Sequence, residues 1–124
     1  MAGKHLVLLG ESVFDNQAYV ARGRAVVDHL RRTLPPSDRV TLLAMDGDGS
    51  QDIPDQLRRL PPDTTHLALS VGGNDVLGCL HAFNAPCRSV SEAFTHLAEL
   101  QSQFASSYRS AVSMVARWQL PCVV

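Results

Sequence analysis

The sequence lacks a net charge of either sign, a long apolar run and an even set of cysteines. Its 124 residues include 11 basic and 12 acidic side chains, which leaves a formal charge of −1. Nucleic acids and anionic membranes recruit strongly basic surfaces, so this balance argues against both as partners. The apolar runs are far shorter than the roughly 20 residues of a membrane-spanning helix, so no membrane span is expected.

The cysteines are three in number, Cys79, Cys87 and Cys122, and the first residues carry no signal-peptide pattern. Both features predict free thiols and a cytoplasmic location. Cys79, His81 and Cys87 offer three candidate metal ligands, but their spacing matches no recognised zinc motif. Hydrophobic residues make up 45% and charged residues 19%, which is the mix of a folded globular protein, and the length predicts one domain over 1–124.

Apolar runs alternate with helical patterns along the chain. The predicted buried strands are 5–9, 40–45, 67–71 and 121–124. The predicted helices are 19–34, 53–60 and, after a capping box at Ser89 and Glu92, 90–118. The segment 76–88 reads as irregular. Apolar strands separated by helices predict a three-layer α/β/α fold around a parallel sheet, in which Tyr19 and Val20 would share the buried stripe of the first helix.

Each of the first three predicted strands is followed by small or polar residues. These segments are Gly10-Glu11-Ser12, Asp46-Gly47-Asp48 and Gly72-Gly73-Asn74-Asp75. The carboxyl ends of parallel strands lie at one edge of the sheet, where sites form. Each segment also has an ordinary structural reading: Ser12 as a helix cap, Gly47 as part of a loop and Asn74 as part of a turn.

The three segments together resemble the SGNH hydrolases, also called the GDSL esterase/lipase family. Gly10, Glu11, Ser12 and Asp15 fall in the family's first block, with Ser12 at the nucleophile. Gly47 matches the glycine of the second block. Gly73, Asn74 and Asp75 match the third block, Gly-x-Asn-Asp. The resemblance implies a parallel sheet of flavodoxin-like order and an esterase or acylhydrolase without metal or cofactor.

The implied mechanism is acyl transfer to a serine. Ser12 would attack a small or lipid-like carboxylic ester, and the oxyanion would be held by the N–H groups of Ser12 and Gly47 and by the side chain of Asn74. Glu11 departs from the Asp that the family usually has before the serine. The larger departure is the absence of the family's C-terminal Asp-x-x-His, which would supply the base and its orienting acid. No such segment follows 121–124, so the sequence predicts a truncated domain, without its last strand or strands and its last helix, that is inactive alone.

The histidines present do not replace that base. Asp63-Thr64-Thr65-His66 matches the string Asp-x-x-His, but His66 opens a strand and would lie about 16 Å from the strand's other end. His5 is excluded for the same reason, and His29 and His96 fall within helices. His81 is the only histidine expected in a loop on the side of the site, and it has no acidic neighbour in sequence.

Two other readings remain open. The chain could be a flavodoxin-like module that binds a ligand at the same sheet edge, although Glu11 would repel a phosphate there. It could also be a non-catalytic interaction fragment. In the truncated domain the apolar run 121–124 is expected at the edge of the sheet, where it would favour self-association.

Overall fold

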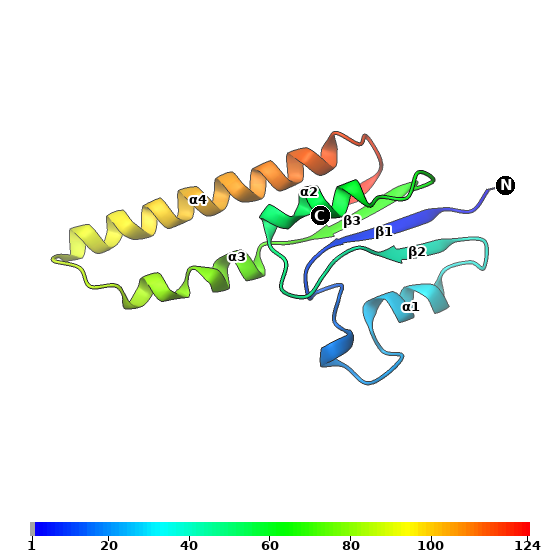
Figure 1. Cartoon of the computed structure of the whole chain (residues 1–124), viewed down its shortest axis with the longest axis horizontal. Helices are drawn as coiled ribbons and strands as arrows, with labels where there is room; N and C mark the ends of the chain where they lie inside the picture. The colour runs from blue at the N-terminus through cyan, green and yellow to red at the C-terminus, as the bar shows by residue number, and fades with distance from the viewer. Residues whose placement is uncertain (1) are drawn as a thin grey trace.

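The computed structural model describes residues 2–124 and contains a parallel four-stranded sheet with helices on both faces (Figure 1). The strands are β1 (His5–Gly10), β2 (Arg39–Leu42), β3 (His66–Ser70) and β4 (Cys122–Val123). Their order in the sheet is β2-β1-β3-β4, which is the flavodoxin-like order. The predicted α/β/α fold with a parallel, flavodoxin-like sheet is confirmed.

The three predicted helices are all present but shorter than expected, and a fourth α-helix, α3, was not predicted. The α-helices are α1 (Val26–Thr33), α2 (Ile53–Arg58), α3 (Gly73–Gly78) and α4 (Val90–Ala116). The 3-10 turns are η1 (Gln17–Tyr19), η2 (Ser50–Asp52) and η3 (Leu80–Asn84). Helix α4 begins as predicted at Ser89, whose hydroxyl oxygen accepts the backbone N–H of Glu92 at 3.1 Å. Its 27 residues span about 40 Å without a break.

Two apolar clusters hold the layers together, one on each face of the sheet. Val7 and Leu9 of β1 pack with α2 and with Ala111 and Val115 of α4. Leu8, which points to the opposite face, packs with α1. This alternation is the ordinary consequence of side chains leaving a strand on opposite sides. The sheet is therefore buried on both faces, as parallel sheets generally are.

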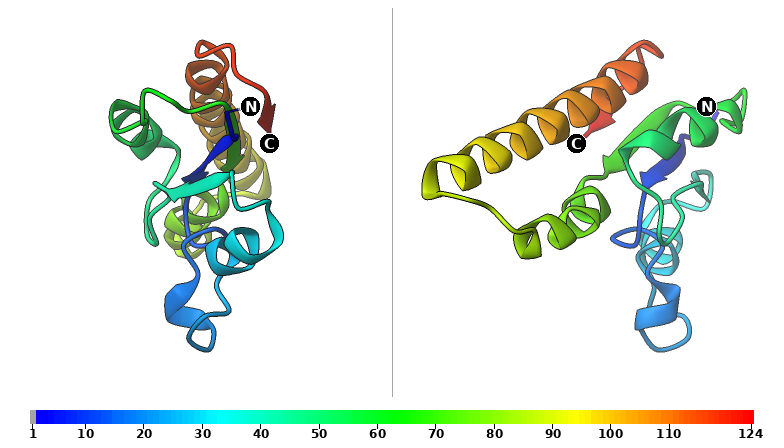
Figure 2. Two further views of the ribbon diagram at one scale, coloured as in Figure 1. Left: turned by 90° about the vertical axis from the view of Figure 1, so that its right-hand side faces the viewer. Right: turned by 60° about the vertical axis from the view of Figure 1, so that its left-hand side comes forward.

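Helix α4 covers the sheet only with its C-terminal half. Its N-terminal half extends past the carboxyl ends of the strands and runs beside α3 and η3 (Figures 1 and 2). We call α3, η3 and 90–104 of α4 the arm. Large apolar side chains on the arm remain exposed, with Phe83 at 64%, Val90 at 72% and Phe94 at 67%.

Two sequence predictions about helices are wrong. The helix expected over 19–34 begins only at Val26, and Tyr19 is 67% exposed instead of lying on a buried stripe. Gly23 has a φ of +77°, which a helix does not accommodate, and the Asn16 side chain accepts the Val26 N–H at 3.0 Å where the helix starts. The segment 76–88, expected to be irregular, contains the last turn of α3 and all of η3.

The fourth strand is the edge of the sheet. Only two of its residues pair with β3, and Val123 is 74% exposed. Among residues 2–124 no other strand lies beyond it. The expected self-association through this edge stays a prediction.

Candidate active site

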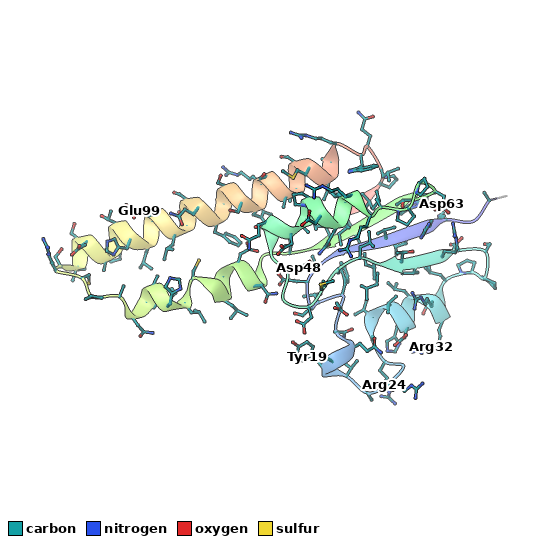
Figure 3. The ribbon with its side chains drawn as sticks, in the orientation of Figure 1. Tyr19, Arg24, Arg32, Asp48, Asp63 and Glu99 are labelled. Carbon is teal, nitrogen blue, oxygen red and sulfur yellow. The ribbon has the colours of Figure 1, made fainter. Side chains whose placement is uncertain are left out.

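The carboxyl ends of β1, β2 and β3 meet at one edge of the sheet, as the sequence predicted. Asp48, from the loop after β2, lies at this edge, whereas Asp63, from the turn before β3, lies at the opposite end (Figure 3). The loops after β1 and β2 carry Ser12 and Gly47 at this edge, and the first turn of α3 carries Asn74.

Glu11 joins the turn after β1 to the start of α3. Its carboxylate is buried, with 4% of the residue exposed, and it accepts the backbone N–H of Asn74 at 3.2 Å. A Cβ on Gly73 would lie 2.5 Å from one of its oxygens, so the absence of a side chain there makes room for the longer Glu. A buried carboxylate needs such donors to offset the loss of its hydration. Glu11 therefore connects the turn that carries Ser12 to the first turn of α3.

Asn74 and Asp75 join α3 to the loop after β2. The side-chain Nδ2 of Asn74 donates to the carbonyl oxygen of Asp48 at 2.8 Å. The Asp75 carboxylate accepts from the backbone N–H of Ser50 and, at 2.6 Å, from its hydroxyl. These contacts hold the Gly47 loop against the first turn of α3.

Gln56 was missed by the sequence analysis, and it connects two of the strand ends. Its side chain is fully buried; Oε1 accepts the Gly10 N–H, and Nε2 donates to the Gly10 carbonyl and to the Asp48 carboxylate, all at 2.8 Å. The available signal was its place three residues after Ile53, on the apolar side of the predicted helix. Gly10 has a φ of +131°, and a Cβ there would lie 1.9 Å from the carbonyl oxygen of Ser70.

Replacing Gln56 with leucine is expected to lower the free energy of unfolding by about 2–4 kcal/mol, because the buried Gly10 N–H loses its partner. Chemical denaturation monitored by circular dichroism measures this loss. Gln103→Leu, at an exposed position of α4, is the matched control and should change stability by less than about 0.5 kcal/mol. Equal stability of the Gln56 variant and the wild type would show that the hydrogen bonds of Gln56 do not stabilise the fold.

The first block contributes a further contact on the outer side of the site. Asp15 accepts the backbone N–H of Asp46 at 2.8 Å, and the Tyr19 hydroxyl donates to the Asp46 carboxylate at 2.7 Å. The hydrogen bond to Asp46, together with its negative charge, raises the pKa of Tyr19. Tyr19 is thus an exposed donor at the site edge and not a core residue.

A hollow of about 290 Å³ lies between the second loop and α3. Its lining includes Gly47, Asn74, Asp75 and Cys79. Gly47 is exposed, with a φ of +91°. Ser12 is half-buried in the turn after β1 and is not part of this lining. The structure thus brings Gly47 and Asn74 to one hollow, and it links Ser12 to them through its neighbour Glu11.

The histidines of the described residues make their contacts elsewhere. His5 is buried at the amino end of β1, where its Nδ1 lies 3.0 Å from Asp63 and its Nε2 lies 2.7 Å from Thr41. Asp63 also pairs with Arg39. His66 bonds Thr65, and His81 is exposed on η3, where it bonds the carbonyl of Gly78. No hydrogen bond joins Ser12 to a histidine within 2–124.

Burial and, secondarily, the Arg39 charge lower the pKa of His5. The unfolded chain therefore takes up a proton near pH 6.5 that the folded chain resists, so stability is expected to fall as the pH drops below about 6.5. A His5→Asn variant should show a flatter dependence between pH 7 and pH 5 in denaturation experiments. His81→Asn, which replaces an exposed histidine, should keep the wild-type slope. An unchanged slope in the His5 variant would refute the assignment.

Within residues 2–124, no cluster of three or more His, Cys, Asp or Glu side chains is arranged to hold a metal ion. In the same residues, none of the helices has the length and apolarity needed to traverse a bilayer. The three cysteines are free thiols.

Solved esterases and lipases share this fold. A variant of the esterase AlinE4 superposes with a TM-score of 0.62 at 20% identity, over 97% of this chain and 57% of that one. An extracellular lipase from Streptomyces rimosus superposes with a TM-score of 0.61 at 16% identity, over 93% of this chain and 55% of the lipase. A variant of Axe2, an acetylxylan esterase from Geobacillus stearothermophilus, superposes with a TM-score of 0.55 at 17% identity, over 96% of this chain and 57% of Axe2. AlinE4 is described as an SGNH-hydrolase family esterase.

The fold of this chain is therefore that of the SGNH hydrolases. The chain spans a little over half the length of the solved proteins described above. At the level of sequence, neither the models of protein families nor the curated proteins give a match.

Proposed function

We propose that the chain carries the nucleophile and oxyanion half of a serine ester-hydrolase site, with Ser12 as the nucleophile. The observation that supports this most is the hydrogen-bonded joining of the three strand ends through Glu11, Asn74, Asp48 and Gln56. A structural turn would not need three loops held together at one rim. Acyl transfer needs a hydroxyl and fixed donors at such a rim.

In this mechanism the Ser12 oxygen attacks the carbonyl carbon of an ester. The charge that develops on the carbonyl oxygen is held by the backbone N–H groups of Ser12 and Gly47 and by the Asn74 amide. An Asn side chain has two N–H donors, and the bond to the Asp48 carbonyl uses one of them. The other is left for the oxyanion, while the first fixes the orientation of the amide.

The mechanism also needs a general base, and no histidine within residues 2–124 bonds Ser12. We infer that an Asp-x-x-His segment, as in the family that the motifs resemble, completes the site in an active chain. The mechanism needs no metal or cofactor. The three free cysteines suit a reducing compartment, and a cytoplasmic location stays the prediction that accompanies them.

The alternative of a ligand-binding or interaction fragment has less support. A phosphate site would need the free N–H groups at the start of α3, but the Glu11 carboxylate already accepts one of them. The test compares this chain with a longer one that contains the Asp-x-x-His segment, and with the Ser12→Ala variant of that longer chain. Ester hydrolysis by the longer chain that does not depend on Ser12 would overturn the proposal.

A further inference from the structure

An open hollow of about 330 Å³ lies between α2 and the last turns of α4. We call it the Trp118 hollow. Its lining combines apolar side chains with two guanidinium groups and the one tryptophan of the sequence, and none of its lining side chains within 2–124 is acidic. The lining includes Leu57, Arg58, Leu60, Met114, Arg117 and Trp118.

The floor of the Trp118 hollow is apolar and held by the core. Helix α2 and the C-terminal half of α4 lie side by side on one face of the sheet (Figures 1 and 2). Leu57 belongs to the buried cluster between them, and Leu60 and Met114 pack against that cluster while remaining half-buried. A ligand with an apolar body would therefore remove further apolar surface of these side chains from water.

Trp118 forms an exposed wall on a fixed backbone. Helix α4 ends at Ala116, and the Trp118 N–H still donates to the Val115 carbonyl at 3.1 Å. The Trp118 residue is nevertheless 47% exposed. Tryptophan and arginine are the side chains most enriched where binding energy concentrates, because the indole ring offers a large apolar area together with one N–H donor. An exposed indole over an apolar floor thus indicates a binding surface.

The two guanidinium groups differ in what they already bind. Arginines near the C-terminus of a helix stabilise the helix by themselves, so their presence alone does not indicate a ligand. Arg58 forms an ion pair with Asp55, whereas Arg117 has no ion-pair partner among residues 2–124. Arg117 therefore brings an uncompensated positive charge to the hollow, and its planar N–H groups match the two oxygens of a carboxylate.

We propose that the Trp118 hollow binds a small carboxylate with an aromatic body. The ring would lie against Trp118 and Met114, and the carboxylate would accept hydrogen bonds from Arg117. The hollow shares no lining residue with the one that contains Gly47 and Asn74. The site is therefore separate from the candidate active site, and a ligand bound there leaves the rim that holds Ser12 open.

The experiment is a titration of the 124-residue protein with hydrocinnamate, followed by NMR through the indole N–H of Trp118. Because the sequence contains one tryptophan, this resonance is identified without further assignment. Hydrocinnamate should shift it saturably, with a dissociation constant on the order of a millimolar, as expected for so small a ligand. Hydrocinnamamide has the same ring and chain without the charge, so it should bind at least about tenfold more weakly.

Arg117→Gln should weaken hydrocinnamate binding at least about fivefold, because the charge-assisted hydrogen bonds are lost. Arg117→Lys keeps the charge without the planar donor pair, so its affinity should lie between those of Arg117→Gln and the wild type. Arg117 is exposed, so both variants should fold. The matched control is Arg24→Gln, in the loop before α1 on the other side of the sheet (Figure 3). It should keep wild-type affinity within about twofold, because solvent ions screen a charge at that distance.

Equal affinity for the acid and the amide would show adsorption to apolar surface alone and would overturn the proposal. Equal losses in Arg117→Gln and Arg24→Gln would overturn it too, because they would show attraction by net charge. A Trp118 resonance that shifts with protein concentration and ignores hydrocinnamate would mean that a second copy covers the hollow, and the assignment would be wrong. Ser12→Ala should bind hydrocinnamate with wild-type affinity; loss of binding in that variant would place the ligand at the other site.

Discussion

Purified as residues 1–124, the chain is expected to hydrolyse p-nitrophenyl butyrate no faster than the buffer does. A serine hydroxyl is a poor nucleophile at neutral pH unless a base takes its proton. Within 2–124 no histidine bonds Ser12: His5 is engaged at the opposite end of the sheet, and His81 bonds the Gly78 carbonyl. Loss of the base of a Ser-His pair costs on the order of a millionfold in turnover.

Release of nitrophenolate, followed in parallel for the short and the extended protein, measures this effect. The extended protein should hydrolyse the ester, and its Ser12→Ala variant should not. Robust hydrolysis by the short protein that disappears in Ser12→Ala would show that a base already lies within it. His81→Ala would then identify whether that base is His81.

In the extended protein, Asn74→Ala should lower kcat by about a hundred- to a thousandfold. The removed amide is one of the donors to the oxyanion, and losing one such donor has this cost. The variant also loses the bond to the Asp48 carbonyl, so its free energy of unfolding should fall by only about 1 kcal/mol. Steady-state kinetics and a denaturation curve on the same sample separate the two effects.

Asn84→Ala is the control for this substitution, because Asn84 is an exposed asparagine on η3. Its kcat should match the wild type. If Asn74→Ala kept full turnover, Asn74 would be a turn-forming residue, and the oxyanion would have to be held by backbone donors alone.

The parallel sheet could be predicted because its signals are local in the sequence. Each long strand is an apolar run, and each run ends in glycine or polar residues. The flavodoxin-like order came from the motif resemblance and not from these runs. The helix expected over 19–34 shows the limit of this kind of prediction. The helical spacing of apolar residues extends back to Tyr19 and Val20. The helix nevertheless begins at Val26, because Gly23 has a positive φ and the Asn16 side chain accepts the Val26 N–H.

The site residues were predictable only where a motif names them. The motifs pointed to Glu11, Asn74 and Asp75, and the structure adds their hydrogen-bond partners. Gln56 carries no motif, and its role depends on the backbone of Gly10, 46 residues away. The placement of α3 and η3 beside the N-terminal half of α4 depends on tertiary structure (Figure 1), and the segment that forms η3 has no apolar period from which it could be predicted.

The bonds at the strand ends also determine how this region opens. Gly10 and Gln56 are 46 residues apart, and Glu11 and Asn74 are 63 apart, so each bond closes a long loop that forms only when the sheet is assembled. The Gly10 amide should therefore exchange with solvent hydrogen only through global unfolding. The hydrogen bonds in the first turns of α4 join residues close in sequence, so we expect these turns to open while the sheet remains folded. Amides in the first turns of α4 are thus expected to exchange faster than those of the rim that holds Ser12.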